Sequence, residues 1–89
     1  IYAEQLLLGS FLINNEFIDT ALEFINIESF FLPAHQEIFD AIHTLRRNNS
    51  LADIVSLKNY FSYNKKIKEI GGDEYILKLV NEASSAVIN

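Results

Sequence analysis

The sequence predicts an all-α fold: a compact multi-helix bundle of five to six short helices, forming a single domain over residues 1–89. Apolar residues recur at helical spacing along almost the whole chain, which favours helices that each bury one face. Only one proline and three glycines are present, so few residues can interrupt those helices. Apolar residues make up 49% of the chain, which is enough for one core and argues against disorder.

The first two predicted helices are separated by the pair Asn14-Asn15. The apolar stripe before that pair consists of Leu7, Leu8, Phe11 and Leu12. Asn15 is a suitable N-cap for the second helix, because its side-chain oxygen can accept from the free amides of the next turn. The second helix carries the apolar residues Phe17, Ile18, Ala21, Leu22 and Ile25. We expect it to end at Asn26.

A third helix is predicted to begin at Pro33, after a turn or a single helical turn over residues 27–32. Proline suits the first position of a helix, where its missing N–H is not needed. The buried face of this helix consists of Ile38, Phe39, Ile42 and Leu45. Arg46 and Arg47 lie in its last turn, where positive charge interacts favourably with the helix dipole. A polar loop, Asn48-Asn49-Ser50, then follows.

Two further helices are predicted in the remainder of the chain. Asp53 is a suitable N-cap for a helix that ends near Tyr63-Asn64. A lysine-rich connector and a turn at Gly71-Gly72 lead to the final helix, which carries Tyr75, Ile76, Leu79, Val80 and Ala83. Over the whole domain, the residues expected in the core are Leu7, Phe11, Leu22, Phe39, Ile42, Leu57, Phe61, Ile76 and Leu79.

Composition and charge exclude several classes of function. The formal net charge of −5 argues against a grip on nucleic-acid phosphates, which requires clustered Lys and Arg. Cysteine is absent, so disulfides and thiolate metal sites are impossible. No apolar run approaches the roughly 18 residues that span a bilayer, so we expect no membrane contact. Because the sequence starts at Ile1 rather than Met, we expect it to be a piece of a longer protein.

The sequence carries no pattern typical of a catalytic, cofactor or metal site. None of the three glycines is followed by Lys-Ser or Lys-Thr, as the phosphate-binding loop of nucleotide hydrolases would require. His35 and His43 lie about 80° apart around a helix, too far for both to hold one metal ion. We expect His35 to satisfy a backbone group at its helix start and His43 to lie at the surface. The dispersed carboxylates are expected on solvated helix faces.

Two groups of residues are candidates for binding a partner. Lys65, Lys66 and Lys68 form the only basic cluster, which could contact nucleic acid or an acidic partner. The alternative is a solvated connector. Tyr60 and Tyr63 lie at the edge of the apolar stripe or off it, and exposed aromatic residues are enriched at protein interfaces. The alternative for Tyr60 is a ring that packs partly into the core, with its hydroxyl in water.

Three stretches of the chain carry motifs that are informative in combination. The first runs from Ala3-Glu4-Gln5 through Gly9 to Leu12-Ile13-Asn14-Asn15. The second joins residues 30–35, Phe-Phe-Leu-Pro-Ala-His, to Ile38-Phe39. The third runs from residues 53–57, Asp-Ile-Val-Ser-Leu, through Ile70-Gly71-Gly72 and Tyr75-Ile76 to Ser84-Ser85-Ala86. In their order and spacing, these stretches resemble the N-terminal domain of DnaB-type replicative DNA helicases over nearly the whole chain.

Two positions depart from the pattern of that family. Lys65 stands where the family usually has glycine, which favours an end of the preceding helix on Asn64 in the left-handed conformation. Ser84 stands where proline is common. Neither departure falls on a predicted core position, so both concern only the local loop shape.

The resemblance implies a parent protein that is a hexameric, ATP-driven helicase of the replication fork, in the cytoplasm. Its downstream motor domain would bind ATP and magnesium and make most of the contacts with DNA. The domain described by this sequence would form a collar on the ring, pair with sister subunits and dock the C-terminal domain of primase, with no catalysis or cofactor of its own. In this family, much of the pairing uses a helical hairpin that follows this segment. The alternative hypothesis is a stand-alone helical interaction or regulatory module.

Overall fold

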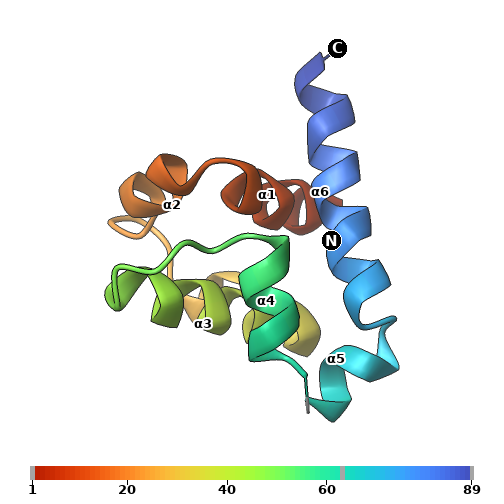
Figure 1. Cartoon of the computed structure of the whole chain (residues 1–89). Helices are drawn as coiled ribbons and strands as arrows, with labels where there is room; N and C mark the ends of the chain where they lie inside the picture. The colour runs from red at the N-terminus through yellow and green to blue at the C-terminus, as the bar shows by residue number, and fades with distance from the viewer. Residues whose placement is uncertain (1, 63, 89) are drawn as a thin grey trace.

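The structure, a computed structural model, describes residues 2–62 and 64–88 and confirms the all-α fold (Figure 1). The elements in chain order are α1 (Tyr2–Ile13), α2 (Asn15–Ala21), the 3-10 turn η1 (Ile27–Ser29), α3 (Pro33–Arg47), α4 (Ile54–Tyr60), α5 (Lys65–Glu69) and α6 (Asp73–Ile88). The described ranges therefore contain six α-helices and no strand, in agreement with the predicted bundle of five to six helices.

The most extensive contact between two elements joins α1 to α6. Figure 1 shows α6 at one side of the molecule, crossing α1, with its last turns extending beyond the other helices. Gly9 permits the close crossing, because a β-carbon there would lie 2.7 Å from the carbonyl carbon of Leu79 and 2.9 Å from the β-carbon of Ala83. The first and last helices thus pack backbone against backbone at this point.

A single core receives side chains from all six described helices. Seven of the nine predicted core residues are buried, namely Phe11, Phe39, Ile42, Leu57, Phe61, Ile76 and Leu79. Leu7 and Leu22 are only partly buried and pack against the outside of this core. Leu8 takes the inner position on α1, which turns Leu8, Gly9, Phe11 and Leu12 inward. Leu22 lies outside because α2 ends at Ala21, so that Leu22 is already its C-cap.

The predicted start of α2 is wrong by one residue. Asn14, not Asn15, is the N-cap, and its side-chain oxygen accepts from the amides of Glu16 at 3.0 Å and Phe17 at 3.3 Å. Two adjacent asparagines offer equivalent caps, and Asn15 instead makes a contact with a distant loop. The helix also ends five residues before Asn26, which caps η1 rather than ending α2.

The segment after α4 departs most from the prediction. α4 ends at Tyr60, and Asn64 is extended, with φ −85° and ψ 114°, rather than left-handed. The Asn64 side chain accepts from the amide of Ile67 at 3.1 Å and thereby caps α5. The lysine-rich segment is therefore a short helix rather than a connector, because Ile67 is buried and holds it against the core, while Lys65, Lys66 and Lys68 are exposed to solvent.

The other predicted helix boundaries are confirmed. Pro33 opens α3, and Arg46 and Arg47 lie in its last turn. Asp53 caps α4 in a reciprocal arrangement with Ser56, whose amide donates to the Asp53 carboxylate at 2.9 Å while its hydroxyl oxygen accepts from the Asp53 amide at 2.8 Å. The turn at Gly71-Gly72 has φ values of 122° and 58°, which glycine adopts without strain.

Candidate protein-docking surface

The described residues that were predicted to bind a partner, Tyr60, Lys65, Lys66 and Lys68, lie at the end of α4 and on α5. Tyr60 is 45% exposed, and its ring lies edge-on to Phe61 with centroids 5.2 Å apart. Lys65, Lys66 and Lys68 are exposed on α5. Lys66 and Lys68 line different surface grooves. Tyr63 lies outside the described residues, so its predicted role stays a prediction.

One groove, which we call the α3–α5 groove, runs between the start of α3 and α5. Its larger part, of about 380 Å³, is lined by Leu32, Pro33, Ala34, Lys66, Glu69 and Ile70. An adjoining part of about 150 Å³ is lined by Ile27, Pro33, Gln36, Glu37, Asp40 and Lys66. The two parts share Pro33 and Lys66 and therefore lie next to each other on the surface. The larger part is mostly apolar, and the charged residues that line the two parts carry both signs of charge.

An ion pair crosses this groove. Lys66 Nζ lies 3.3 Å from Glu37 Oε1, and the Asn64 side-chain amide donates to Glu37 Oε2 over 3.3 Å. Lys66 is exposed, so the pair is held weakly against water. Asp40 and Glu69, on the two sides of the groove, are also exposed.

A second groove, of about 360 Å³, lies where α4, α5 and the start of α6 meet. Its lining contains Lys58, Asn59, Phe61, Ser62, Ile67, Lys68, Gly72 and Asp73. Lys58 Nζ lies 3.9 Å from Asp73 Oδ2, a loose pair between two exposed side chains. The charges of this groove are thus mixed, and only two of its side chains, Phe61 and Ile67, are apolar and buried.

The two aromatic residues with the greatest exposed fraction are not among those that the sequence predicts to bind a partner. Phe24 is 80% exposed and Phe31 is 77% exposed. Phe31 follows the buried Phe30 in an extended segment, where adjacent side chains point to opposite sides. That alternation was the available signal, because Phe30 and Phe31 cannot both face the core. A separate apolar hollow, lined by Ser10, Ile13, Asn14 and Phe17, lies at the corner between α1 and α2.

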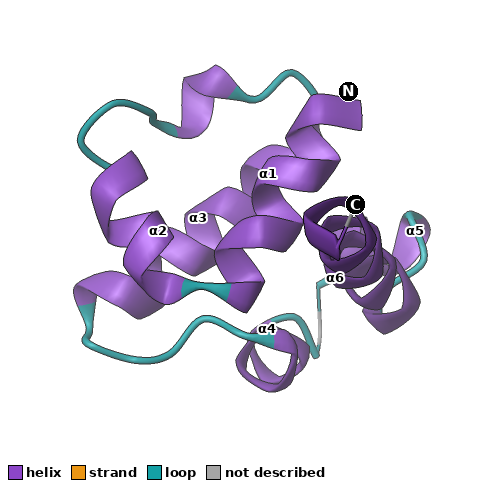
Figure 2. Cartoon of the chain, turned by 90° about the horizontal axis from the view of Figure 1, so that it is seen from above, coloured by secondary structure: helices purple, strands orange, loops and turns teal. Residues whose placement is uncertain are grey.

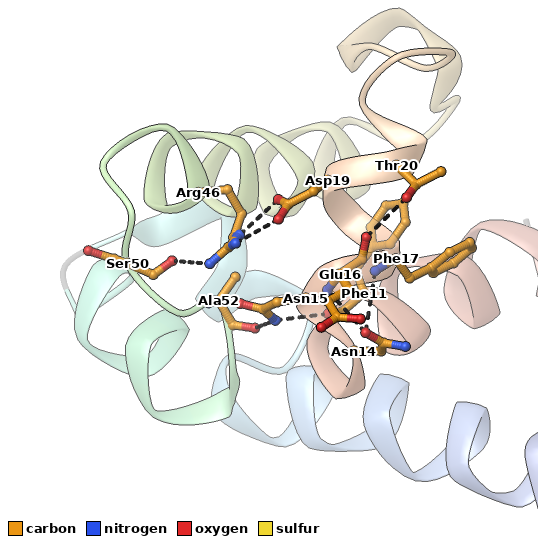
Figure 3. Close-up of polar contacts among 10 residues, drawn as sticks. All are labelled: Phe11, Asn14, Asn15, Glu16, Phe17, Asp19, Thr20, Arg46, Ser50 and Ala52. Atoms are coloured by element: carbon orange, nitrogen blue, oxygen red, sulfur yellow. Dashed lines mark hydrogen bonds and ion pairs between the residues drawn. The ribbon is translucent and has the colours of Figure 1, made fainter.

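The α1–α2 corner is tied to the loop before α4 by polar contacts, drawn in Figure 3. The Asn15 side chain donates to the Ala52 carbonyl at 2.9 Å and accepts from the Ala52 amide at 2.8 Å. Arg46 donates to both carboxylate oxygens of Asp19, at 3.0 and 2.7 Å, and to the Ser50 carbonyl at 3.1 Å. The hydrogen bonds from Arg46 hold the pKa of the Asp19 carboxyl below its usual value.

A buried histidine joins α1, α3 and α6. His35 is fully buried, with Nδ1 2.8 Å from Glu4 Oε1 and Nε2 2.6 Å from the Tyr75 hydroxyl. Its predicted partner was a backbone group, and this expectation is wrong, since both partners are side chains from distant elements. His43, expected at the surface, is half-buried, with its ring 5.9 Å from that of Phe39.

Glu4 is the hub of this network. Its second oxygen accepts from the amide of Phe31 at 3.0 Å, which holds the loop after η1 beside the start of α1, as Figure 2 shows. Burial by itself would raise the pKa of the Glu4 carboxyl. Hydrogen bonds from His35 and from the backbone of Phe31 and Leu32 outweigh burial and lower that pKa. Burial also raises the pKa of the Tyr75 hydroxyl. The network positions the segment that leads into the α3–α5 groove.

Residues 2–62 and 64–88 contain no group of three or more His, Cys, Asp or Glu side chains that could hold a metal ion. Over the same residues, no helix is both long and apolar enough to cross a membrane. What the described surface offers is a set of open grooves and exposed apolar side chains.

The fold and the surface thus define a small all-helical domain, and comparison with known proteins identifies its class. The chain is 38% identical over 89 residues to the replicative DNA helicase DnaB of Rickettsia felis and 39% identical to that of Rickettsia typhi. A probable replicative DNA helicase of Trieres chinensis is 34% identical over 85 residues. These matches cover 96–100% of this chain, but the chain spans only 18–19% of the length of these relatives.

The family model described as the DnaB-like helicase N terminal domain matches residues 1–89. The chain therefore belongs to this family, as the motifs in the sequence predicted.

Proposed function

We propose that this chain is the N-terminal domain of a replicative DNA helicase and works as a collar of its hexameric ring. In that role it mediates subunit assembly and docks the C-terminal domain of primase, without catalysis of its own. The observation that carries the proposal is the family match over residues 1–89, together with relatives of 37–39% identity that are named replicative helicases.

The physical character of the domain supports a role in binding rather than in chemistry. Exposed apolar side chains beside open grooves are the material of protein interfaces. The net charge of −5 makes the domain a poor partner for DNA phosphates. ATP and magnesium would be bound by a separate motor domain of the parent protein, which would also make most of the DNA contacts. The site of action would be the replication fork in the cytoplasm.

The test uses the full-length protein that contains this chain. Native mass spectrometry is expected to give a hexamer, and deletion of residues 1–89 is expected to weaken it. Calorimetric titration with the C-terminal domain of primase from the same source is expected to show binding that the deletion abolishes. A ring that assembles normally and binds primase without residues 1–89 would contradict the proposal.

A further inference from the structure

The α3–α5 groove has a chemistry that specifies the kind of partner it fits. Leu32, Pro33, Ala34 and Ile70 give its larger part an apolar floor. Three carboxylates stand around the groove, Glu37 and Asp40 from α3 and Glu69 from α5. Lys66 is the only basic residue that lines either part. A ligand that fills the groove therefore needs apolar side chains with positive charge beside them.

The charge distribution along the chain strengthens this preference. Residues 1–45 carry seven acidic residues and no Lys or Arg, and all seven basic residues lie in residues 46–89. One side of the groove, formed by η1 and the first turns of α3, thus belongs to a purely acidic part of the chain. Such a field steers positively charged partners toward the surface.

Lys66 occupies the position that a partner cation would take. It lies 3.3 Å from Glu37 at the junction of the two parts of the groove. Glu37 is half-buried, but Lys66 is exposed, so little free energy is needed to release the lysine, and an incoming Arg or Lys could replace Lys66 on Glu37. Lys66 would then compete with the cation of the partner for Glu37 and so reduce the affinity of the groove for that partner.

We propose that the α3–α5 groove docks a basic amphipathic helix of a partner protein, with apolar side chains over Ala34 and Ile70 and a cation on Glu37. This inference rests on the proposed role of the domain as a docking module. A second copy of this chain is a poorer occupant of this groove, because a net charge of −5 does not complement the carboxylates that line it. The hollow beside Ile13 and Phe17 contains no charged lining that would identify an occupant.

The first experiment measures fluorescence anisotropy of a labelled synthetic helix with leucines at i and i+4 spacing and arginines beside them. A peptide with glutamate in place of arginine, and another with serine in place of leucine, are the ligand controls. The Arg–Leu peptide is expected to bind this chain, and its NMR shift changes are expected at Ala34 and Ile70. Binding of the Glu peptide with equal affinity, or no binding of the Arg–Leu peptide, would overturn the proposal.

Matched variants of the chain test the competitor role of Lys66. Lys66→Gln is expected to tighten binding of the Arg–Leu peptide by about two- to fivefold, in line with release of an exposed ion pair. Lys68→Gln removes the same charge from the same helix but lines another groove, so a smaller change is expected. Equal effects of the two variants would mean that only net charge matters, and the assignment would fail.

A second pair of variants reverses charge inside and outside the groove. Asp40→Lys is expected to weaken peptide binding by about five- to tenfold, whereas Glu23→Lys, at an exposed position that does not line the groove, is expected to change it much less. Circular dichroism checks that every variant is folded. Sedimentation that shows dimers displaced by the peptide would assign the groove to a second copy and overturn the choice of partner.

The outcome is separable from that of the proposed function. If the full-length protein forms rings and binds primase but the peptide does not bind, only the groove assignment is wrong. If rings and primase binding do not depend on residues 1–89 but the peptide binds as described, the proposed function fails, although the groove does bind a basic amphipathic helix.

Discussion

His35 shows how a single side chain can organise three helices. Its two ring nitrogens reach Glu4 on α1 and Tyr75 on α6, while the residue itself belongs to α3. An ionised carboxylate can only accept, so Nδ1 must carry a proton toward Glu4. A buried polar group that loses its partner costs more than the hydrogen bond itself contributes, so the three residues depend on one another.

The depressed pKa of Glu4 makes part of the stability depend on pH. A carboxyl group whose pKa is lowered by folding contributes stability that is fully present above its ordinary value of 4.5. That contribution is lost as the pH falls through the lower folded-state pKa. We therefore expect urea midpoints to fall as the pH drops below the ordinary value of 4.5, and Glu4→Gln to reduce this dependence of stability on pH. At neutral pH, Glu4→Gln is expected to cost about 1 kcal/mol.

The control for this prediction is Glu28→Gln, which removes an exposed carboxylate of the same acidic part of the chain. If Glu4→Gln and Glu28→Gln changed the slope of stability against pH equally, the hydrogen bonds to Glu4 would not be its source.

Asn15 is a second residue whose role depends on distant contacts. Asn15→Asp keeps the acceptor for the Ala52 amide but loses the donor for the Ala52 carbonyl, and places a carboxylate beside that carbonyl. We expect a loss of about 1–3 kcal/mol in the free energy of unfolding, measured by urea denaturation. Asn81→Asp, at an exposed position on α6, makes the same chemical change and is expected to have little effect. Equal losses would contradict the pairing with Ala52.

The roles of His35 and Asn15 could not be predicted from sequence patterns, because their partners lie far away in the sequence. Asn14 is the N-cap of α2, while the side chain of Asn15 is paired with Ala52, far along the chain. Which of the two asparagines caps the helix thus depends on a distant contact. The same applies to His35, whose partners come from the first and last helices. Helix spacing predicts which face a residue occupies, but it does not tell which distant side chain will meet it.

At the scale of elements, helical spacing and capping residues predicted most of what was found. Pro33, Asp53 and the glycine pair mark boundaries through local chemistry, which a sequence displays directly. The prediction was wrong for α5, whose five residues include three lysines and have the composition of a connector. Burial of Ile67 and the cap from Asn64 are tertiary effects, and they override the local composition.

That failure also limited the prediction of the candidate site. The sequence presents the lysines as one basic cluster, but on a helix Lys66 and Lys68 project in different directions and line separate grooves. The acidic side of the α3–α5 groove comes from α3, which no sequence spacing connects to α5. Only the packing of the two helices brings Glu37 to Lys66.

The crossing of α1 and α6 leads to a prediction for Gly9. Gly9→Ala would improve helix propensity, but its methyl group would collide with the backbone of Leu79, which cannot rotate away. The two helices would have to separate, so we expect a loss of about 3 kcal/mol or more, the upper range for overpacking. Thermal denaturation followed by circular dichroism measures it.

The neighbouring variant Ser10→Ala is the control, since it also replaces a small residue on α1. It removes the hydrogen bond to the Leu6 carbonyl, whose partner remains in the helix, and is expected to stay within about 0.5 kcal/mol of the parent chain. A stable Gly9→Ala variant would show that the helices are not in backbone contact.

For the whole molecule, the single core implies one cooperative transition. The radius of gyration is 11.9 Å, close to the roughly 12 Å expected for a compact chain of this length. The core residues meet in one cluster that includes side chains of α1, α3, α4, α5 and α6. A small domain of this type has a small free energy of unfolding, so a single cavity in the core is expected to lower the stability of the whole domain.

Phe39→Ala is expected to destabilise the domain by about 3–5 kcal/mol, because Phe39 is buried and contacts the rings of Phe11 and Phe30. With about 4–8 °C of melting temperature per kcal/mol, the fall should exceed 10 °C. Phe24→Ala deletes the same side chain where it is 80% exposed and is expected to leave the melting temperature nearly unchanged. Equal falls in melting temperature for both variants would show that Phe39 does not lie in the core.

The contact of α1 with α6 also determines when the domain can fold in the cell. The ribosome synthesises α1 before α6. The contact of Gly9 with Leu79 and Ala83 therefore cannot form until the intervening helices and α6 itself have emerged. Until then, the face of α1 that packs against α6 is uncovered. The nascent chain thus carries an open apolar face until α6 has left the exit tunnel, which makes it a natural substrate for chaperones during that time.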